Sequence, residues 1–315
     1  MLEIRNLSKY YGNKKAIDQI SFSVGNREIL GLLGTNGAGK STTMNMITGY
    51  LASTSGDIRI DGIDVLDQPL LAKKKIGYLP EKPPLYLEMS VDAYLKYVAQ
   101  LKKIAIPYRE HISEVCEMTG ITHVKQRIIR NLSKGYQQRV GIAQALLGYP
   151  ENLILDEPMV GLDPKQIVEI RNLIQRLGEK HTVILSSHIL SEIQTTCSRI
   201  LVIHEGKLIA DGKPDELEQK LGVDNGLYVA LETEENQAYT LLQSIPGVRS
   251  VEKVEKKEEG IVEFLLKCEE CADVRRPVCW MMSEQQIPIM GLRQEKTSLE
   301  QLFLTLTNTE KETNK

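Results

Sequence analysis

The stretch Gly34-Thr35-Asn36-Gly37-Ala38-Gly39-Lys40-Ser41 decides the fold. It matches the pattern G-x-x-x-x-G-K-[ST] over its whole length, and it lies between the apolar run Glu28–Leu33 and a helical segment. In that context the glycines let backbone N–H groups converge on phosphate oxygens, and the helix N-terminus adds a partial positive charge. A chance match in a chain of this length has a frequency on the order of 1%. The stretch therefore predicts a loop that binds the phosphates of a nucleotide.

The residue types in this loop predict separate roles. The Lys40 ammonium can reach the β- and γ-phosphates, and the Ser41 hydroxyl can bind Mg²⁺. The residues predicted to contact the nucleotide here are Gly34, Asn36, Gly37, Ala38, Gly39, Lys40, Ser41 and Thr42.

A second acidic segment supplies the remaining metal ligand. Leu153-Ile154-Leu155 is a short apolar strand, and it is followed by Asp156, Glu157 and Pro158. The carboxyl edge of an open α/β sheet is where ligands bind, so the strand delivers Asp156 to that edge. Asp156 is predicted to hold Mg²⁺, directly or through water, and Glu157 to polarise the attacking water as a general base. Solvated acids are common at strand ends, so the prediction depends on the phosphate loop beside this pair.

Length and composition exclude several classes of protein. The chain has 315 residues, about two domains, with 42% apolar and 26% charged residues, which excludes a disordered chain, a collagen or a small disulfide scaffold. With 39 basic and 42 acidic residues the net charge is −3, and no nucleic-acid partner is expected. No stretch has the roughly 20 apolar residues of a spanning helix, and the N-terminus does not resemble a secretion signal. The five cysteines are expected to be ordinary reduced thiols.

The patterning predicts an α/β fold with a P-loop NTPase core, an antiparallel β arm, a helical insertion and a small α+β ferredoxin-like C-terminal domain. Residues 1–220 are expected to form the nucleotide-binding domain, with helices over about 83–150 and Ser90 capping one of them. Residues 221–309 are predicted to form strands and helices in the order βαββαβ. The predicted strands and helices there are 227–232, 235–245, 248–255, 261–268, 272–284 and 290–295, with a last helix from Ser298 and a flexible tail at 310–315.

Three further segments resemble motifs of the ABC ATPases. Leu132-Ser133-Lys134-Gly135-Tyr136-Gln137-Gln138-Arg139 resembles the LSGGQ-type signature. Gly161-Leu162-Asp163 resembles the D-loop, and His188 after an apolar strand resembles the switch histidine. With the phosphate loop and the acidic segment, these motifs stand in the order typical of the family. The resemblance covers roughly residues 1–220.

The resemblance implies that two nucleotide-binding domains close head to tail over two ATP molecules. Ser133 and Gly135 would then contact the γ-phosphate bound by the other subunit, His188 would hold the water geometry, and Asp163 would connect the two sites. Tyr11 stands where the family has an aromatic residue that stacks on adenine. The alternatives are an ordinary helix cap at Ser133, an ordinary core or surface histidine at His188 and an edge-strand tyrosine at Tyr11.

Two positions depart from the common family pattern. Ile76-Gly77-Tyr78-Leu79-Pro80-Glu81 places Glu81 where the Q-loop usually has Gln. A carboxylate can still bind Mg²⁺, but it lacks the amide donor and adds a negative charge. Lys134 replaces the common Gly of the signature, where a side chain is tolerable if it points outward. In having Leu-Pro-Glu at this position, the chain resembles the subgroup of gliding-motility, drug-resistance and sodium-efflux ATPases.

The resemblance implies an ATP-binding and ATP-hydrolysing subunit of an ABC transporter of the exporter type, with ATP and Mg²⁺ as cofactors. Its expected partners are a second copy or a paired ATPase subunit and a polytopic membrane permease, which would dock near the Q-loop and residues 83–110. The expected location is the cytoplasmic face of the membrane, as a peripheral protein. A soluble ABC ATPase acting on a macromolecular complex is the alternative, and a P-loop kinase is a more distant one. The C-terminal domain is expected to support dimerisation or to bind a regulatory ligand.

Overall fold

The structure is a computed structural model, which describes residues 1–104, 107–214, 216–217, 226–254, 260–269 and 273–295. The chain divides into two compact units, Met1–Pro214 and Asp215–Lys315. The sequence placed this division at residue 220. Each unit is described separately below.

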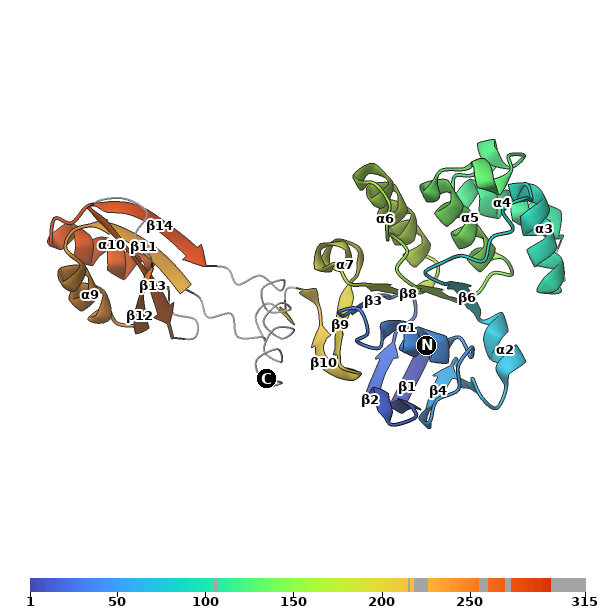
Figure 1. Cartoon of the computed structure of the whole chain (residues 1–315), viewed down its shortest axis with the longest axis horizontal. Helices are drawn as coiled ribbons and strands as arrows, with labels where there is room; N and C mark the ends of the chain where they lie inside the picture. The colour runs from blue at the N-terminus through green and yellow to red at the C-terminus, as the bar shows by residue number, and fades with distance from the viewer. Residues whose placement is uncertain (105–106, 215, 218–225, 255–259, 270–272, 296–315) are drawn as a thin grey trace. The chain divides into compact units, whose positions relative to one another are not determined.

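A six-stranded sheet forms the centre of the first unit, in the order β10-β9-β3-β8-β7-β6 (Figure 1). The neighbours from β9 to β6 are parallel, and β10 pairs with β9 in the antiparallel sense. Most of these strands are short and continuously apolar, as expected of strands with both faces buried. Their bounds are Ile29–Leu33 for β3, Ile76–Leu79 for β6, Asn152–Leu155 for β7, Thr182–Ser187 for β8, Arg199–His204 for β9 and Lys207–Gly212 for β10.

An antiparallel β arm lies on one side of this sheet, with helix α1 between them (Figure 1). The arm has the order β2-β1-β4-β5, and its inward side chains join those of β3 and α1 in one hydrophobic core. Leu2, Ile4, Leu30, Leu32 and Met44 are buried in that core. The bounds are Leu2–Tyr11 for β1, Lys14–Val24 for β2, Ser55–Ile60 for β4, Ile63–Asp64 for β5, Lys40–Ile47 for α1 and Pro69–Lys74 for α2.

The helical insertion and two further helices lie on the other side of the sheet (Figure 1). The Ser90 hydroxyl accepts a hydrogen bond from the Ala93 N–H and so caps α3 as predicted. Asp163 caps α6 in the same way through the N–H of Gln166. The bounds are Val91–Leu101 for α3, Tyr108–Met118 for α4, Lys134–Leu146 for α5, Pro164–Gly178 for α6 and Leu190–Thr196 for α7, with 3₁₀ turns at Thr122–Val124 and Ile129–Asn131.

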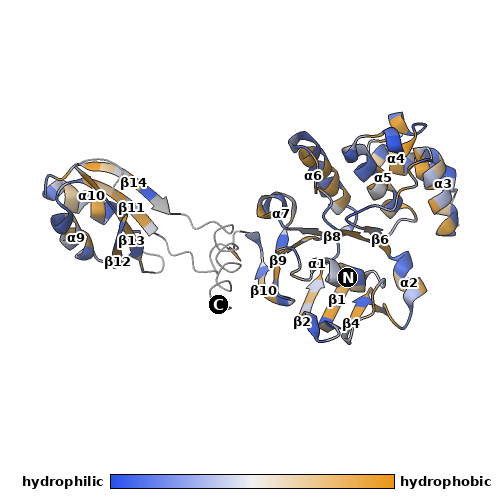
Figure 2. Ribbon diagram, viewed as in Figure 1, coloured by the Kyte–Doolittle hydropathy of each residue, from blue (hydrophilic) through white to orange (hydrophobic). Residues whose placement is uncertain are grey.

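The second unit has the order βαββαβ, with an antiparallel sheet in the order β12-β13-β11-β14. Alternate residues of β11 and β13 are buried and, with apolar side chains of α9 and α10, form a core of their own. Figure 2 shows apolar segments of this unit in orange. The bounds are Gly226–Glu232 for β11, Glu235–Gln243 for α9, Val248–Val254 for β12, Ile261–Cys268 for β13, Arg275–Glu284 for α10 and Ile289–Glu295 for β14.

The predicted element ends differ from the observed ones by a few residues. Helix α9 ends at Gln243 rather than at 245, because Pro246 lies close behind and disfavours helical backbone in the preceding residue. Helix α10 begins at Arg275, whereas we predicted its start at 272. The helix predicted from Ser298 and the tail at 310–315 lie outside the described residues.

Candidate functional site

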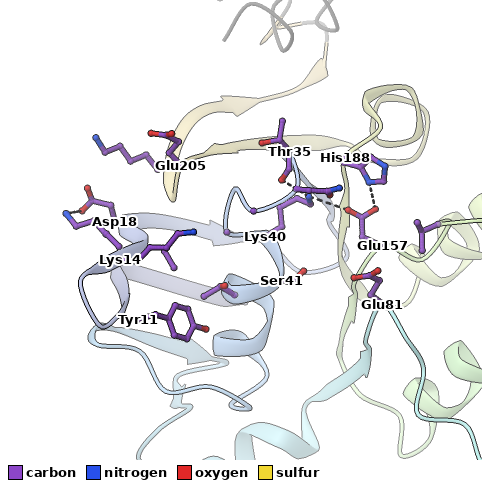
Figure 3. A pocket seen from close by; sticks show the side chains of 18 residues that line it. Tyr11, Lys14, Asp18, Thr35, Lys40, Ser41, Glu81, Glu157, His188 and Glu205 are labelled. Carbon is purple, nitrogen blue, oxygen red and sulfur yellow. Dashed lines mark hydrogen bonds and ion pairs between the residues drawn. The ribbon is translucent and has the colours of Figure 1, made fainter. Parts of the chain in front are cut away.

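A pocket of about 950 Å³ lies where the β arm meets the phosphate loop and the carboxyl edge of the sheet (Figure 3). Residues that the sequence singled out are among its lining: Tyr11, Asn36, Gly37, Gly39, Lys40, Ser41, Thr42, Glu81, Glu157 and His188. Tyr11 lies at one end of the pocket, and Lys40, Glu157 and His188 lie together at the other (Figure 3). Charged side chains of both signs therefore line the end of the pocket beside the phosphate loop. An aromatic side chain from the β arm lines the other end.

The backbone of the phosphate loop requires glycine at particular places. Gly39 has φ 112° at the N-terminus of α1, in the region that side chains disfavour. A Cβ atom on Gly34 would lie 2.5 Å from the Ile203 carbonyl oxygen of β9. Between them, the Ala38 N–H donates to the Thr35 carbonyl over 3.1 Å. The loop is thus held against the sheet at the start of α1, where free N–H groups can meet an anion.

Lys40 is almost wholly buried, and its ammonium group lies inside the loop. It donates to the Gly34 and Thr35 carbonyls over 2.8 and 3.2 Å, and it lies 3.4 Å from Glu157 Oε1. These contacts balance the charge of a lysine that is only 5% exposed. The same ammonium can exchange the carboxylate for a phosphate oxygen.

Ser186 joins the two acidic residues, a role that we did not predict from the sequence. Its hydroxyl donates to Asp156 Oδ1 over 2.6 Å and accepts from the Glu157 N–H over 2.8 Å. Ser41 donates to the same Asp156 oxygen over 3.2 Å. Burial raises the pKa of Asp156, the charges of Glu157 and Glu81 raise it further, and the two hydroxyl bonds oppose them. The signal in the sequence was the polar pair Ser186-Ser187 at the end of an apolar strand.

His188 and Glu157 are in direct contact at the edge of the sheet. His188 Nδ1 lies 2.9 Å from Glu157 Oε2, and the dashed line in Figure 3 marks this contact. Glu157 has φ 47°, the left-handed conformation that is uncommon for residues with side chains. The arrangement turns its carboxylate toward both Lys40 and His188 and leaves it 8% exposed.

The oxygen atoms at this end of the pocket fit a hard divalent cation. The donor set is the Ser41 hydroxyl and the carboxylates of Asp156 and Glu81, and Mg²⁺ prefers oxygen ligands of this kind. In the part of the chain that the structure describes, no cluster of three or more His, Cys, Asp or Glu is arranged to hold a metal.

Ser133 and Gly135 lie apart from this pocket. Ser133 caps α5 by accepting from the Tyr136 N–H over 3.5 Å, which is also the alternative that we considered for it. Gly135 is buried against Gln166, where a Cβ atom would lie 2.8 Å from the amide carbon. Both line a second pocket of about 220 Å³ that also includes Asp163. Within one chain the signature thus faces a different surface from the phosphate loop.

Lys134 meets the condition under which a side chain is tolerable at this signature position. Its side chain is exposed, but it extends over Gly161, where a Cβ atom would lie 2.1 Å from the ammonium nitrogen. Gly161 has φ 65°, a conformation that favours glycine, whereas the flexible Lys134 side chain could move away from a Cβ atom there.

The cysteines fit the thiol prediction in the described residues. Cys116, Cys197 and Cys268 are buried free thiols and Cys279 is an exposed one, while Cys271 lies outside the described residues. Among the helices that the structure describes, none combines the length and apolar character needed to cross a membrane.

Comparisons with known proteins identify the family. The ABC transporter family profile matches residues 17–160. The chain is 33% identical to the bacitracin transport ATP-binding protein BcrA of Bacillus licheniformis, over 97% of both chains. It is also 33% identical to the linearmycin resistance ATP-binding protein LnrL of Bacillus subtilis, over 98% of both chains. A solved ATP-binding subunit of an ABC transporter is 30% identical and superposes with a TM-score of 0.64, over 70% of this chain and 93% of that one. The P-loop fold, the nucleotide site and these full-length matches together place the chain in the ABC transporter ATP-binding family, as an ATP-hydrolysing subunit.

Proposed function

We propose that two copies of this chain close head to tail over two ATP molecules and drive export through a separate polytopic membrane permease. The observation that carries the proposal is the division of the site between two surfaces of one unit. The phosphate loop, the acids and His188 line one pocket, and Ser133 and Gly135 line another. Each surface carries only part of the proposed ATP site. In a head-to-tail pair, the first surface of each copy faces the second surface of the other copy, and two complete sites are formed.

In this proposal the phosphate loop binds ATP and the signature of the other copy covers it. The loop N–H groups and Lys40 hold the β- and γ-phosphates, and Tyr11 stacks on adenine. The Tyr11 ring is 51% exposed at the pocket, so its face is accessible. Ser133 and Gly135 present a hydroxyl, an N–H and the N-terminus of α5 to the γ-phosphate, and Asp163 connects the two sites.

Glu157 and His188 are proposed to act on the attacking water. The Glu157 carboxylate contacts both Lys40 and His188. When phosphate replaces the carboxylate at Lys40, Glu157 is free to accept the proton of the water that attacks the γ-phosphorus. His188 holds that water and the γ-phosphate in line. Once the γ-phosphate is released, the contacts between the two copies are lost and the pair opens.

Ser41, Asp156 and Glu81 are proposed to hold Mg²⁺, which when bound neutralises the charge on the β- and γ-phosphates. The buried Asp156 carboxylate receives hydrogen bonds from Ser41 and Ser186, so its orientation is fixed before any ligand arrives. Glu81 is exposed and lines the same end of the pocket.

The permease is proposed to dock on the segment that follows Glu81, at the cytoplasmic face of the membrane. Tyr86 and Leu87 there are 53% and 43% exposed, and apolar side chains of this kind are typical of contact surfaces. The export direction is supported by the relatives named for bacitracin transport and linearmycin resistance.

The test is purification of the tagged Glu157→Gln chain from its native cells in mild detergent, with ATP present, followed by mass spectrometry. The variant keeps the phosphate contacts and removes the base, so it should hold the closed state. We expect a stoichiometric polytopic membrane protein, and the Tyr86→Ala/Leu87→Ala variant should recover less of it. Recovery of ribosomal or DNA-repair proteins without a permease would contradict the proposal and favour the soluble ATPase alternative.

A further inference from the structure

We propose that Lys134 of one copy supplies a positive charge to the ATP site of the second copy, where it pairs with Glu81. The inference rests on the proposed head-to-tail dimer. It explains two departures from the family pattern together, a carboxylate in place of an amide and a lysine in place of a glycine, because their charges are opposite.

The end of the pocket beside the phosphate loop, called the phosphate end below, has more acidic than basic side chains. Asp156 and Glu157 are buried there, Glu81 lies beside them, and the charge of Glu81 contributes to the raised pKa of Asp156. Lys40 is the buried cation at this end, and it is already paired with Glu157. Within the described ranges, Glu81 forms no ion pair of its own. ATP bound with the proposed Mg²⁺ still adds net negative charge, so closure of the site favours a further cation from outside the chain.

Lys134 is a cation in a locally unfavourable place. It is the first residue of α5, and the positive end of a helix dipole disfavours a neighbouring cation. The first turn of α5 contains no acidic residue. Across the residues that the structure covers, Lys134 has no carboxylate partner within ion-pair distance. A sequence that breaks a local rule without compensation inside the fold is commonly explained by function.

The side chain of Lys134 extends toward Gly161. The ammonium lies over this glycine, in the loop that runs from Glu157 and Val160 at the first pocket to Asp163 at the second. The charge thus lies at the border between the lining of the first pocket and the lining of the second. In a head-to-tail pair, this border meets the phosphate end of the other copy, where Glu81 is exposed.

A double-mutant cycle on the full-length chain tests the pair. The parent is Glu157→Gln, and the added changes are Lys134→Met, Glu81→Gln and both together, since methionine keeps the length of the side chain and glutamine keeps the shape of Glu81. The dissociation constant of the ATP-dependent dimer is measured by sedimentation with Mg²⁺ and ATP. We expect Lys134→Met to weaken the dimer by about tenfold when Glu81 is present and by about twofold or less in the Glu81→Gln background. The difference should decrease as salt is raised from about 0.05 to 0.5 M.

Lys165→Met is the matched control, because Lys165 lines the same surface as Ser133. It removes one positive charge there, and it should change the dissociation constant by the same factor with Glu81 present and in the Glu81→Gln background. Equal effects of Lys134→Met in the two backgrounds, with a parent that dimerises, would overturn the Lys134–Glu81 pair alone. A parent that stays monomeric with ATP would overturn the proposed dimer and this inference with it.

Discussion

Ser186 shows how a single buried hydroxyl organises the chemistry of this site. It fixes the Asp156 carboxylate through one hydrogen bond and the backbone of Glu157 through another. The hydroxyl is fully buried, so water cannot replace either bond at low cost. Both proposed functions of this segment, metal binding and proton transfer, therefore depend on a residue that itself touches no substrate.

We expect Ser186→Ala to lower the free energy of unfolding by about 1–3 kcal/mol, because the buried Glu157 N–H loses its acceptor. The ATP hydrolysis rate should fall by roughly tenfold or more, as for other residues that orient metal ligands. Urea unfolding and steady-state ATP turnover check the two effects. Ser198→Ala, which removes an exposed hydroxyl, is the control. A Ser186→Ala protein as stable and active as the control would contradict this account.

The charge on Asp156 is expected to destabilise the nucleotide-free protein. Because burial raises its pKa in the folded state above the ordinary 3.8, the folded chain binds this proton more tightly than the unfolded chain. The cost is present at neutral pH and is relieved as the pH falls through the raised pKa toward 3.8. Asp156→Asn should therefore raise the urea midpoint at pH 7, with a smaller gain at lower pH, while ATP hydrolysis is lost. A lower midpoint at pH 7 would refute the argument.

At this scale the sequence singled out many of the residues that line the pocket, but not Lys14, Lys15, Asp18, Glu205 or Lys207, and not the contacts among them. Lys40, Ser41, Glu157 and His188 could be found because each belongs to a motif with fixed spacing. Ser186 could not, because a serine at a strand end has no distinctive pattern and its partners are about thirty residues away in sequence.

Helix α5 begins at the signature, and its last turn lies beside Lys102 of the helical insertion. Ser133 caps the first turn, and at the other end the Lys102 ammonium donates to the Gln144 and Leu147 carbonyls over 3.0 and 2.9 Å. A cation at the C-terminal end of a helix also interacts favourably with the helix dipole. Both ends of the element that carries the signature are thus held by side chains.

Lys102→Met should destabilise the protein by about 1 kcal/mol, because α5 loses this cap. Lys103→Met is the control, since the neighbouring lysine is also exposed. The urea midpoint measures the difference between the two variants. Equal midpoints would show that the cap contributes nothing to stability.

The elements were predicted most reliably where two signals agreed. The apolar runs at β3, β7 and β8 each precede a polar motif, and Ser90 marks the start of α3. Lys102 was not predicted as a cap, because its partners at the end of α5 are brought near it only by packing.

At the scale of the whole molecule, two of the hydrophobic cores in the described residues lie in different units of the chain. One core joins the β arm, α1 and the central sheet, and the other lies between the C-terminal sheet and its two helices. Phe264 is 1% exposed in the second core. Separate cores in one chain commonly give separate unfolding transitions.

We expect Phe264→Ala to destabilise the second unit by about 3–5 kcal/mol and to shift only one of two calorimetric transitions. Leu30→Ala, in the first core, should shift the other transition. ATP should raise the temperature of the transition that Leu30→Ala affects, because the phosphate loop belongs to that unit. A single transition that moves with both variants would contradict this division.

We propose that this chain hydrolyses ATP with Glu157 as the general base. Steady-state ATP hydrolysis of the full-length wild-type and Glu157→Gln chains tests it most directly, with ATP binding measured in parallel. The account predicts a fall of about a hundredfold or more in the hydrolysis rate, since general bases contribute factors of this size, with ATP binding retained. A variant that hydrolyses ATP at the wild-type rate would contradict the account.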